Sequence, residues 1–217
     1  MTHEFKTPLS SILIASNYAA KQEAIEQHPK LKKYVSIIIE QSNKLNQHIE
    51  KILNVAKSDG NLRQLEKKRF NIEETLELVR DNASLKFPHA HVTVSSNETG
   101  QIILADEFHF YNIAYNIVEN AIKYGNGAPK VDIQVNVLPK AIELSFKDNG
   151  SGIPSSHLEY VFDRFYRVPR ESKKEVEGFG IGLFYVKKIC DLHHWKINIK
   201  NNPDEGITVT IIIPKKV

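Results

Sequence analysis

Apolar residues recur at helical spacing over the first part of the chain. Between Leu9 and about Ala56 they return every three or four positions, with one break at residues 27–30. This pattern predicts a helical hairpin. Its second arm carries the stronger stripe, which has the a/d spacing of a helical bundle and comprises Leu31, Tyr34, Ile38, Ser42, Leu45, Ile49, Ile52 and Ala56. One hairpin cannot bury two stripes well, so we predict that two copies pair as a dimeric four-helix bundle.

The pattern becomes mixed after a turn signal at residues 58–61. Asn71 followed by Glu74 is an N-cap signature for a helix whose buried side would contain Leu76, Val79 and Ala83. Further helices are predicted at about 107–124 and 181–192, and strands at 91–95, 102–105, 131–138, 141–147, 196–200 and 208–213. We therefore predict an α+β protein with a helical hairpin at 1–58 and a second domain at 59–217.

Composition narrows the function classes. The chain has 217 residues, 41% of them hydrophobic, which is enough for a buried core. A formal net charge of +3 is too small a bias for a nucleic-acid-binding protein, so DNA binding is excluded as the main activity. The single cysteine, Cys190, excludes an internal disulfide and a cysteine zinc cluster and fits a reducing compartment. No apolar run approaches the roughly 18 residues of a membrane span, so we expect a soluble, cytoplasmic chain.

Two glycine clusters are candidates for phosphate binding. DNGSG at 148–152 follows a predicted strand, and GFGIGL at 178–183 opens a predicted helix. Glycines let the backbone approach a phosphate, and N–H groups at a helix N-terminus can hold it. The second cluster lacks the early βαβ position of a dinucleotide fingerprint, and the chain has no P-loop motif, so a Rossmann assignment fails. Taken alone, each cluster is equally compatible with a flexible turn.

Asn116 and Asn120 lie four residues apart in the helix predicted at 107–124, and Lys123 and Tyr124 follow them. This spacing puts both amides on one helical face, where they could supply neutral oxygen ligands to a Mg²⁺ already held by phosphates and water. Lys123 is near enough to reach a phosphate. Asparagine is unfavourable inside a helix, which argues for a functional reason, and a solvated polar face is the alternative.

The chain begins with His3 beside Glu4. A histidine next to a carboxylate at an exposed helix start can act as a nucleophile that the carboxylate orients and deprotonates. Taken alone, a histidine near a terminus is usually just solvated.

In this order the motifs resemble those of a bacterial sensor histidine kinase of a two-component system, over nearly the whole chain. HEFKTPL at 3–9 is similar to the phospho-acceptor H-box, NIVENAIKY at 116–124 to the N-box, DNGSG at 148–152 to the first glycine box, FDRFYR at 162–167 to the F-box, and GFGIGL at 178–183 to the second glycine box. The resemblance implies a dimerisation and histidine-phosphotransfer hairpin followed by a Bergerat-type ATP-binding domain, an α/β sandwich with one mixed sheet and a layer of helices.

The resemblance also implies the activity, which is ATP-dependent autophosphorylation of a histidine and transfer of the phosphoryl group to an aspartate of a response regulator receiver domain. His3 would attack the γ-phosphate, and Glu4 would be the general base. Thr7 would help to position water when the same domain dephosphorylates the regulator.

Nucleotide contacts follow from the same resemblance. Asn120 would bind Mg²⁺, and Asp148 would accept a hydrogen bond from the exocyclic amine of adenine. Residues 163–179 resemble a mobile ATP lid. The other implied contacts are Asn116 and Lys123 at the phosphates, Tyr124 on the adenine, Gly150 and Gly152 beside the base, Arg164 and Arg167 in the lid, and Gly178, Gly180, Gly182 and Leu183 at the phosphates.

Two features depart from the family pattern. The residues at 193–195, HHW, stand where the usual turn is His-Gly-Gly, which leaves the geometry of this turn open. Two adjacent histidines are more typical of a surface than of a metal site. The chain also starts two residues before His3, so we interpret it as a cytoplasmic fragment of a longer protein in the bacterial inner membrane.

Two alternatives belong to other function classes. The first is a degenerate kinase that keeps the fold and serves as a nucleotide-binding scaffold, against which the intact His3, Glu4, Asn120 and Asp148 argue. The second is an ATPase of the same fold, or a protein-serine kinase that acts on an anti-sigma partner. Such proteins lack an H-box hairpin, which this chain has.

Overall fold

The protein is described by a computed structural model, which defines residues 2–21, 27–39, 42, 65–169 and 180–215. The chain divides into two compact units, Met1–Arg63 and Gln64–Val217, each described by itself below. The domain boundary expected after residue 58 lies outside the described residues and stays a prediction.

The described residues of the first unit form two helical segments. Helix α1 spans Thr2–Ala20, and residues 29–39 form a second helical segment. Pro29 is the first residue of this segment, where a backbone N–H would have no partner within the helix. A new helix can therefore begin at Pro29, which explains the break expected at 27–30. The rest of the expected second arm, from 43 onwards, lies outside the described residues. Large apolar side chains of both segments are exposed, namely Ile12, Ile14, Tyr18, Leu31, Tyr34, Ile37 and Ile38.

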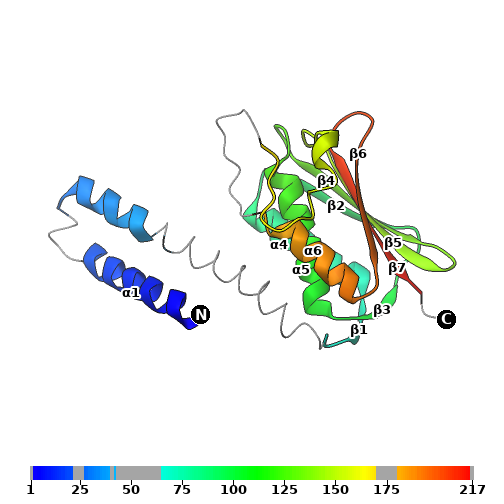
Figure 1. Ribbon diagram of the computed structural model, residues 1–217, viewed down its shortest axis with the longest axis horizontal. Coiled ribbons are helices and arrows are strands. Elements are labelled where there is room, and N and C mark those ends of the chain that lie inside the picture. The colour runs from blue at the N-terminus through cyan, green and yellow to red at the C-terminus, as the bar shows by residue number, and fades with distance from the viewer. Residues whose placement is uncertain (1, 22–26, 40–41, 43–64, 170–179, 216–217) are drawn as a thin grey trace. The chain divides into compact units, whose positions relative to one another are not determined.

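The second unit is built on a five-stranded mixed sheet with the order β2-β4-β5-β7-β6 (Figure 1). Strands β2 and β4 are parallel, and the other neighbours are antiparallel. In β4, Val131, Ile133 and Val135 are buried and alternate with exposed polar residues, so one face of the sheet forms the core. The strands are β2 (His91–Ser96), β4 (Lys130–Val137), β5 (Ala141–Asp148), β6 (Lys196–Asn201) and β7 (Ile207–Pro214).

Three helices pack on that face, namely α4 (Ile72–Lys86), α5 (Glu107–Lys123) and α6 (Gly182–Leu192) (Figure 1). Asn71 caps α4, because its side chain accepts hydrogen bonds from the backbone N–H groups of Glu73 and Glu74 at 2.9 and 3.4 Å. The expected buried side of this helix is confirmed, since Leu76, Val79 and Ala83 are at most 1% exposed. The predicted α+β class, with an α/β sandwich as its second part, is therefore confirmed.

A small second sheet was not expected. Strand β1 (Lys68–Asn71) pairs antiparallel with β3 (Ile102–Ala105). Only Phe70 of β1 is apolar, and it is buried against the ring of Phe110 at 5.3 Å between centroids. A strand with one apolar residue has no alternation to detect. Among the described helices, none combines the length and apolarity that crossing a membrane requires.

Candidate nucleotide-binding site

Helix α5 presents one polar face. Asn116, Asn120 and Lys123 follow each other at spacings of four and three, so they share this face and are half-buried. The opposite face is buried through Ala114 and Val118. The amide Nδ2 of Asn116 donates to the carbonyl of Asn112 at 2.7 Å, which orients its Oδ1 away from its own helix.

Both asparagines meet the start of α6. A Cβ added to Gly182 would lie 3.2 Å from Oδ1 of Asn116 and 3.5 Å from Nδ2 of Asn120. The N-cap residue Ile181 makes no side-chain capping bond, so within the described part of the chain the first N–H groups of α6, including that of the half-buried Leu183, have no side-chain cap. The N-box and the second glycine box are therefore in contact, with helix N–H groups beside two amide oxygens. An anion is the natural ligand of such a place.

Asp148 ends β5 and is 8% exposed. Its Oδ1 accepts from the backbone N–H of Gly150 at 2.8 Å and from that of Ile207 at 3.1 Å. Burial raises the pKa of this carboxyl, and the two N–H donors oppose the rise. In the described part of the chain both hydrogen bonds end on Oδ1, which leaves Oδ2 to accept from a ligand.

Gly150 joins the loop after β5 to the end of α5. It forms an isolated antiparallel bridge with Gly125, and an added Cβ would lie 2.8 Å from the carbonyl oxygen of Tyr124. Gly152 has φ +71, and its Cβ would lie 3.1 Å from Oδ1 of Asn201. The first glycine box is thus packed between the N-box and the end of β6. Gly150 lies between the carboxylate of Asp148 and the backbone carbonyl of Tyr124.

Sequence reasoning missed Gly206. This residue has φ +77, and an added Cβ would overlap the backbone of Asp148 and lie 2.6 Å from its Oδ1. A side chain here would displace the carboxylate. The only signal was a turn composition, NPDEG at 202–206, which does not reveal that the turn folds against a residue more than fifty positions earlier.

The F-box is anchored to Gly180, two residues before the start of α6. Phe165 has φ 67, which is unusual for a bulky residue, and its N–H donates to the carbonyl of Gly180 at 3.0 Å. The guanidinium of Arg164 lies 4.9 Å from the ring centroid of Phe165 and 6.0 Å from that of Phe184. Arg164 and Arg167 are both exposed. Residues 170–179 of the expected lid, including Gly178, lie outside the described residues.

Lys123 has a carboxylate partner that the sequence analysis did not identify. Its Nζ lies 3.3 Å from Oε1 of Glu119. The same oxygen accepts from Nζ of Lys86, on α4, at 2.8 Å. Glu119 is 6% exposed, so a buried carboxylate lies directly beside the phosphate-binding face that the resemblance implies.

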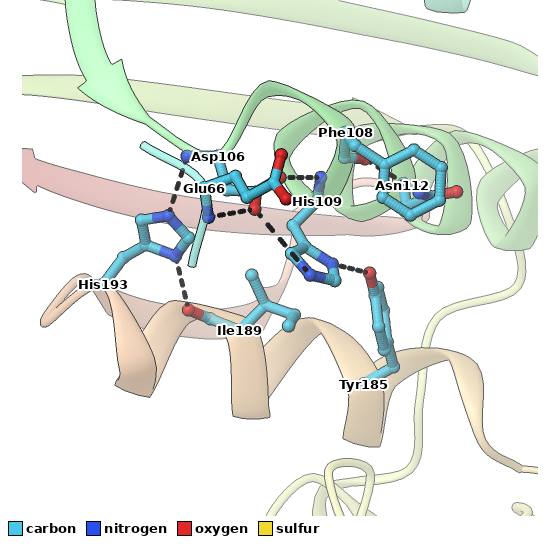
Figure 2. A network of polar contacts seen from close by, with 8 residues as sticks. All are labelled: Glu66, Asp106, Phe108, His109, Asn112, Tyr185, Ile189 and His193. Atoms are coloured by element: carbon cyan, nitrogen blue, oxygen red, sulfur yellow. Dashed lines mark hydrogen bonds and ion pairs between the residues drawn. The ribbon is translucent and has the colours of Figure 1, made fainter. Parts of the chain in front are cut away.

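The turn after α6 differs from expectation. His193 is buried, and only His194 is exposed, with φ 58. His193 accepts through Nε2 from the N–H of Asp106 at 3.2 Å, and its Nδ1 lies 3.0 Å from the carbonyl of Ile189 (Figure 2). A carbonyl can only accept, so Nδ1 carries the proton and the ring is neutral. Burial lowers the pKa of His193 accordingly.

The same network ties the start of α5 to α6 (Figure 2). Asp106 caps α5 by accepting from the N–H of His109 at 3.0 Å, and it also accepts from the N–H of Glu66 at 2.9 Å. Nδ1 of His109 lies 2.6 Å from the hydroxyl of Tyr185, in the first turns of α6. Burial raises the pKa of Tyr185, which is therefore a neutral hydrogen-bonding group.

His3, Glu4 and Thr7 belong to the first unit and lie within α1. Their side chains are outside the described part of the structure. A spacing of four along a helix places His3 and Thr7 on the same face. The nucleotide residues belong to the second unit.

The chemistry of the donor set is compatible with a nucleotide and a metal ion. Among the described residues, no group of three or more His, Cys, Asp or Glu side chains could hold a metal by itself. A Mg²⁺ ion here would depend on an amide oxygen, for which Asn120 is placed, together with phosphate and water oxygens. Neutral amides near a triphosphate also add no repulsion.

These features define an α/β-sandwich nucleotide-binding domain preceded by a helical unit. The family of histidine kinase-, DNA gyrase B- and HSP90-like ATPases matches residues 105–217, and the His Kinase A (phospho-acceptor) domain family matches residues 1–61. The chain therefore belongs to the sensor histidine kinases of two-component systems, with a phospho-acceptor domain followed by an ATP-binding domain of this ATPase family.

Relatives match along the whole chain. Sensor protein RprX of Bacteroides fragilis is 34% identical over 99% of this chain and 42% of its own length. Sensor protein SrrB of Staphylococcus aureus is 27% identical over 99% of this chain and 37% of its own length. The chain thus spans less than half of the length of these relatives.

Solved structures show the same fold. Full-length ShkA, in complex with AMPPNP, superposes with a TM-score of 0.83 at 20% identity, over 98% of this chain and 44% of its own. ThkA, in complex with the response regulator protein TrrA, superposes with a TM-score of 0.69 at 23% identity, over 99% of this chain and 59% of its own. At these identities the likeness concerns the fold alone.

Proposed function

We propose that the chain is the catalytic portion of a histidine kinase that uses Mg-ATP to phosphorylate His3 and passes the phosphoryl group to an aspartate of a response regulator receiver domain. We propose further that it works as a homodimer and also dephosphorylates the regulator. The observation that carries the kinase assignment is the contact of Gly182 with Asn116 and Asn120, because it places helix N–H groups and two amides around one point.

Different residues of the site contact the base, the phosphates and the metal ion. Oδ2 of Asp148 accepts a hydrogen bond from the exocyclic amine of adenine. Gly150 leaves room for the base, and Tyr124 lies beside it. The phosphates lie at the start of α6, at the backbone N–H groups of Gly182 and Leu183. Mg²⁺, when bound, neutralises charge on the phosphates. Asn120 contributes an amide oxygen to the metal.

Transfer to His3 forms a nitrogen–phosphorus bond and breaks the bond between the γ-phosphorus and the bridging oxygen, which leaves as ADP. The imidazole proton passes to Glu4, which acts as general base. ShkA is described with AMPPNP and ThkA with a response regulator protein, and these descriptions support ATP and a receiver domain as the two partners proposed here.

The test is transfer of label from γ-³²P-ATP. The wild-type chain should be labelled, and the label should be lost in acid, since phosphohistidine is acid-labile and phosphoserine is not. His3→Ala should abolish labelling and leave the affinity for ATP within a few-fold, whereas Asn120→Ala should reduce both. An acid-stable product would favour a protein-serine kinase, and nucleotide binding without any labelling would favour the degenerate scaffold.

Thr7→Ala tests the regulator phosphatase. Autophosphorylation should be spared, because attack by His3 needs no hydroxyl, whereas the water that attacks an acyl phosphate must be positioned. Measuring both reactions on one preparation decides the role of Thr7. If both rates fall together, Thr7 only supports the helix before Pro8.

The homodimer is supported by the exposed apolar residues of α1 and of residues 29–39. Sedimentation that finds only monomers at high concentration would reject it. A parent protein in the bacterial inner membrane stays a proposal of the same kind, for which the full-length protein would have to be fractionated.

A further inference from the structure

Glu119 joins two lysines of different helices. It lies on α5 directly before Asn120, and its side chain is 7% exposed. Its Oε1 accepts from Nζ of Lys86 at 2.8 Å and lies 3.3 Å from Nζ of Lys123. Lys86 is in the last turn of α4 and Lys123 in the last turn of α5. Two ammonium groups therefore share one carboxylate oxygen.

Lys86 approaches this oxygen from the side of α5 that faces α4. Its Nζ also lies 5.7 Å from the ring centroid of Tyr115, four positions before Glu119. Asn116 and Asn120, by contrast, meet Gly182 of α6. At 100° per residue, Glu119 lies between these two directions. Lys86 is thus connected to the asparagine face through Glu119.

The three groups carry a net charge of +1. Burial opposes the charge of Lys86, but the hydrogen bond and the charge of Glu119 outweigh it, and the pKa of Lys86 is raised. Lys86 is therefore ionised near neutral pH. Without Lys86 the pair of Glu119 and Lys123 would be neutral, and of these two lysines only Lys123 would face the buried carboxylate.

We propose that Lys86 is a positioning residue for the triphosphate: by neutralising Glu119, it leaves the charge of Lys123 available to the phosphates of ATP. The proposal rests on the proposed function, since it assumes that ATP binds at the Asn116–Asn120 face. It adds a residue of α4, outside every motif of the chain, to the determinants of nucleotide affinity.

The proposal is tested with variants that change the net charge of the Lys86–Glu119–Lys123 cluster. Their affinities for Mg-ATP and for adenosine are measured by calorimetric titration. Lys86→Met makes the cluster neutral and should weaken Mg-ATP binding by about three- to tenfold at low salt, with less effect at high salt. Adenosine carries no phosphate, so its affinity should stay within about twofold of wild type. The double variant Lys86→Met with Glu119→Gln has a net charge of +1 again and should bind Mg-ATP as wild type does.

Two controls are matched in charge and place. Lys86→Arg keeps the charge and should preserve Mg-ATP affinity. Arg80→Met removes one positive charge from the same helix, but Arg80 is paired with Glu77 and Asp81 of its own helix, so it should leave the affinity unchanged. Lys86 is half-exposed, so its single variants should fold, which thermal melting checks.

Several results would overturn the proposal. Equal losses for Mg-ATP and adenosine would mean that Lys86 only supports the fold. A double variant as weak as Lys86→Met would mean that Lys86 contacts the phosphates directly. If the melting temperature of the double variant is much lower than that of wild type, the comparison rests on Lys86→Met and Lys86→Arg. Equal affinities of these two variants for Mg-ATP would then reject the proposal. A wild-type chain that does not bind Mg-ATP would reject the proposed function itself.

Discussion

The two oxygens of Asp148 have different surroundings, and this difference predicts the effect of an amide in its place. In Asp148→Asn, the amide oxygen can keep both hydrogen bonds from Gly150 and Ile207. The NH₂ group then occupies the position of Oδ2, where it donates and opposes the exocyclic amine of adenine. The affinity for ATP should fall by about ten- to a hundredfold, which is the value of a lost charge-assisted hydrogen bond.

Calorimetric titration with ATP and with inorganic triphosphate measures this effect. Triphosphate does not contact the carboxylate in our assignment, so its affinity should change little. The melting temperature should stay close to that of wild type, because the backbone donors keep an acceptor. Equal losses for both ligands would reject the adenine-reading role of Asp148.

His193 makes stability depend on pH. Its neutral ring accepts from the N–H of Asp106, and burial lowers its pKa in the folded protein. The charged or titratable groups that also act on its pKa are Lys67 and His109, which lower it, and the carboxylate of Asp106, which raises it. An unfolded histidine takes up a proton near pH 6.5. Below that value the unfolded state binds more protons, so this contribution to stability is complete above about pH 6.5 and is lost as the pH falls through the folded pKa.

Urea unfolding near pH 7.5 and near pH 5.5 should therefore show a loss in the free energy of unfolding, by at most about 1.4 kcal/mol per pH unit for this group. His193→Gln should be less stable at both values and should lose the part of the pH slope that His193 supplies. His194→Gln, at the exposed neighbour, is the matched control and should keep the wild-type slope. An unchanged slope in His193→Gln would contradict the argument.

At the scale of elements, the sequence predicted the helices and strands whose position is determined by neighbouring residues. Asn71 and Glu74 located the start of α4, and the apolar run of residues 102–105 gave β3 with its bounds unchanged. Strand β1 was missed because only Phe70 is apolar in it, and its partner lies about thirty residues later. The 3₁₀ turn Ser155–His157 has no periodicity that could be detected.

The candidate site follows the same rule. Asn116, Asn120 and Gly182 were found because motifs mark them. Gly206, Lys86 and Glu119 were not, because each acts through a contact between segments far apart in the chain. Asp148 and Gly206 are brought together by the pairing of β5 with β7, and this register cannot be derived from either segment alone.

The turn between β6 and β7 yields an element-scale prediction. Gly206→Ala should lower both the melting temperature and the affinity for ATP, because the new methyl group overlaps Asp148 in addition to the strain of a positive φ. Gly100→Ala is the control, since Gly100 has φ +80 and open space at its Cβ. Gly100→Ala should lower the free energy of unfolding by about 1–2 kcal/mol and leave the affinity for ATP unchanged. Equal effects of the two variants would show that the overlap is relieved without moving Asp148.

On the scale of the whole molecule, the residues that we propose for binding and for transfer belong to different units. All described residues of the nucleotide site lie in Gln64–Val217, which has its own buried core, and His3 lies in Met1–Arg63. Binding should therefore need one unit, whereas transfer should need both units to meet. The covalent connection supplies this encounter at an effective concentration that is typically about millimolar for a short linker.

Separating the units should therefore uncouple the two activities. A fragment of residues 64–217 should bind ATP within about twofold of the whole chain, because it contains every described residue that we assign to the nucleotide site, but it should not be labelled by γ-³²P-ATP. Adding the separately prepared fragment 1–63 should restore labelling of His3, at a rate that rises with its concentration and stays below that of the intact chain at micromolar levels, as the loss of tethering requires. The control is fragment 1–63 with His3→Ala, which should remain unlabelled. Labelling of fragment 64–217 alone would place the acceptor outside the hairpin, and a large loss of ATP affinity on separation would mean that the first unit helps to form the nucleotide site.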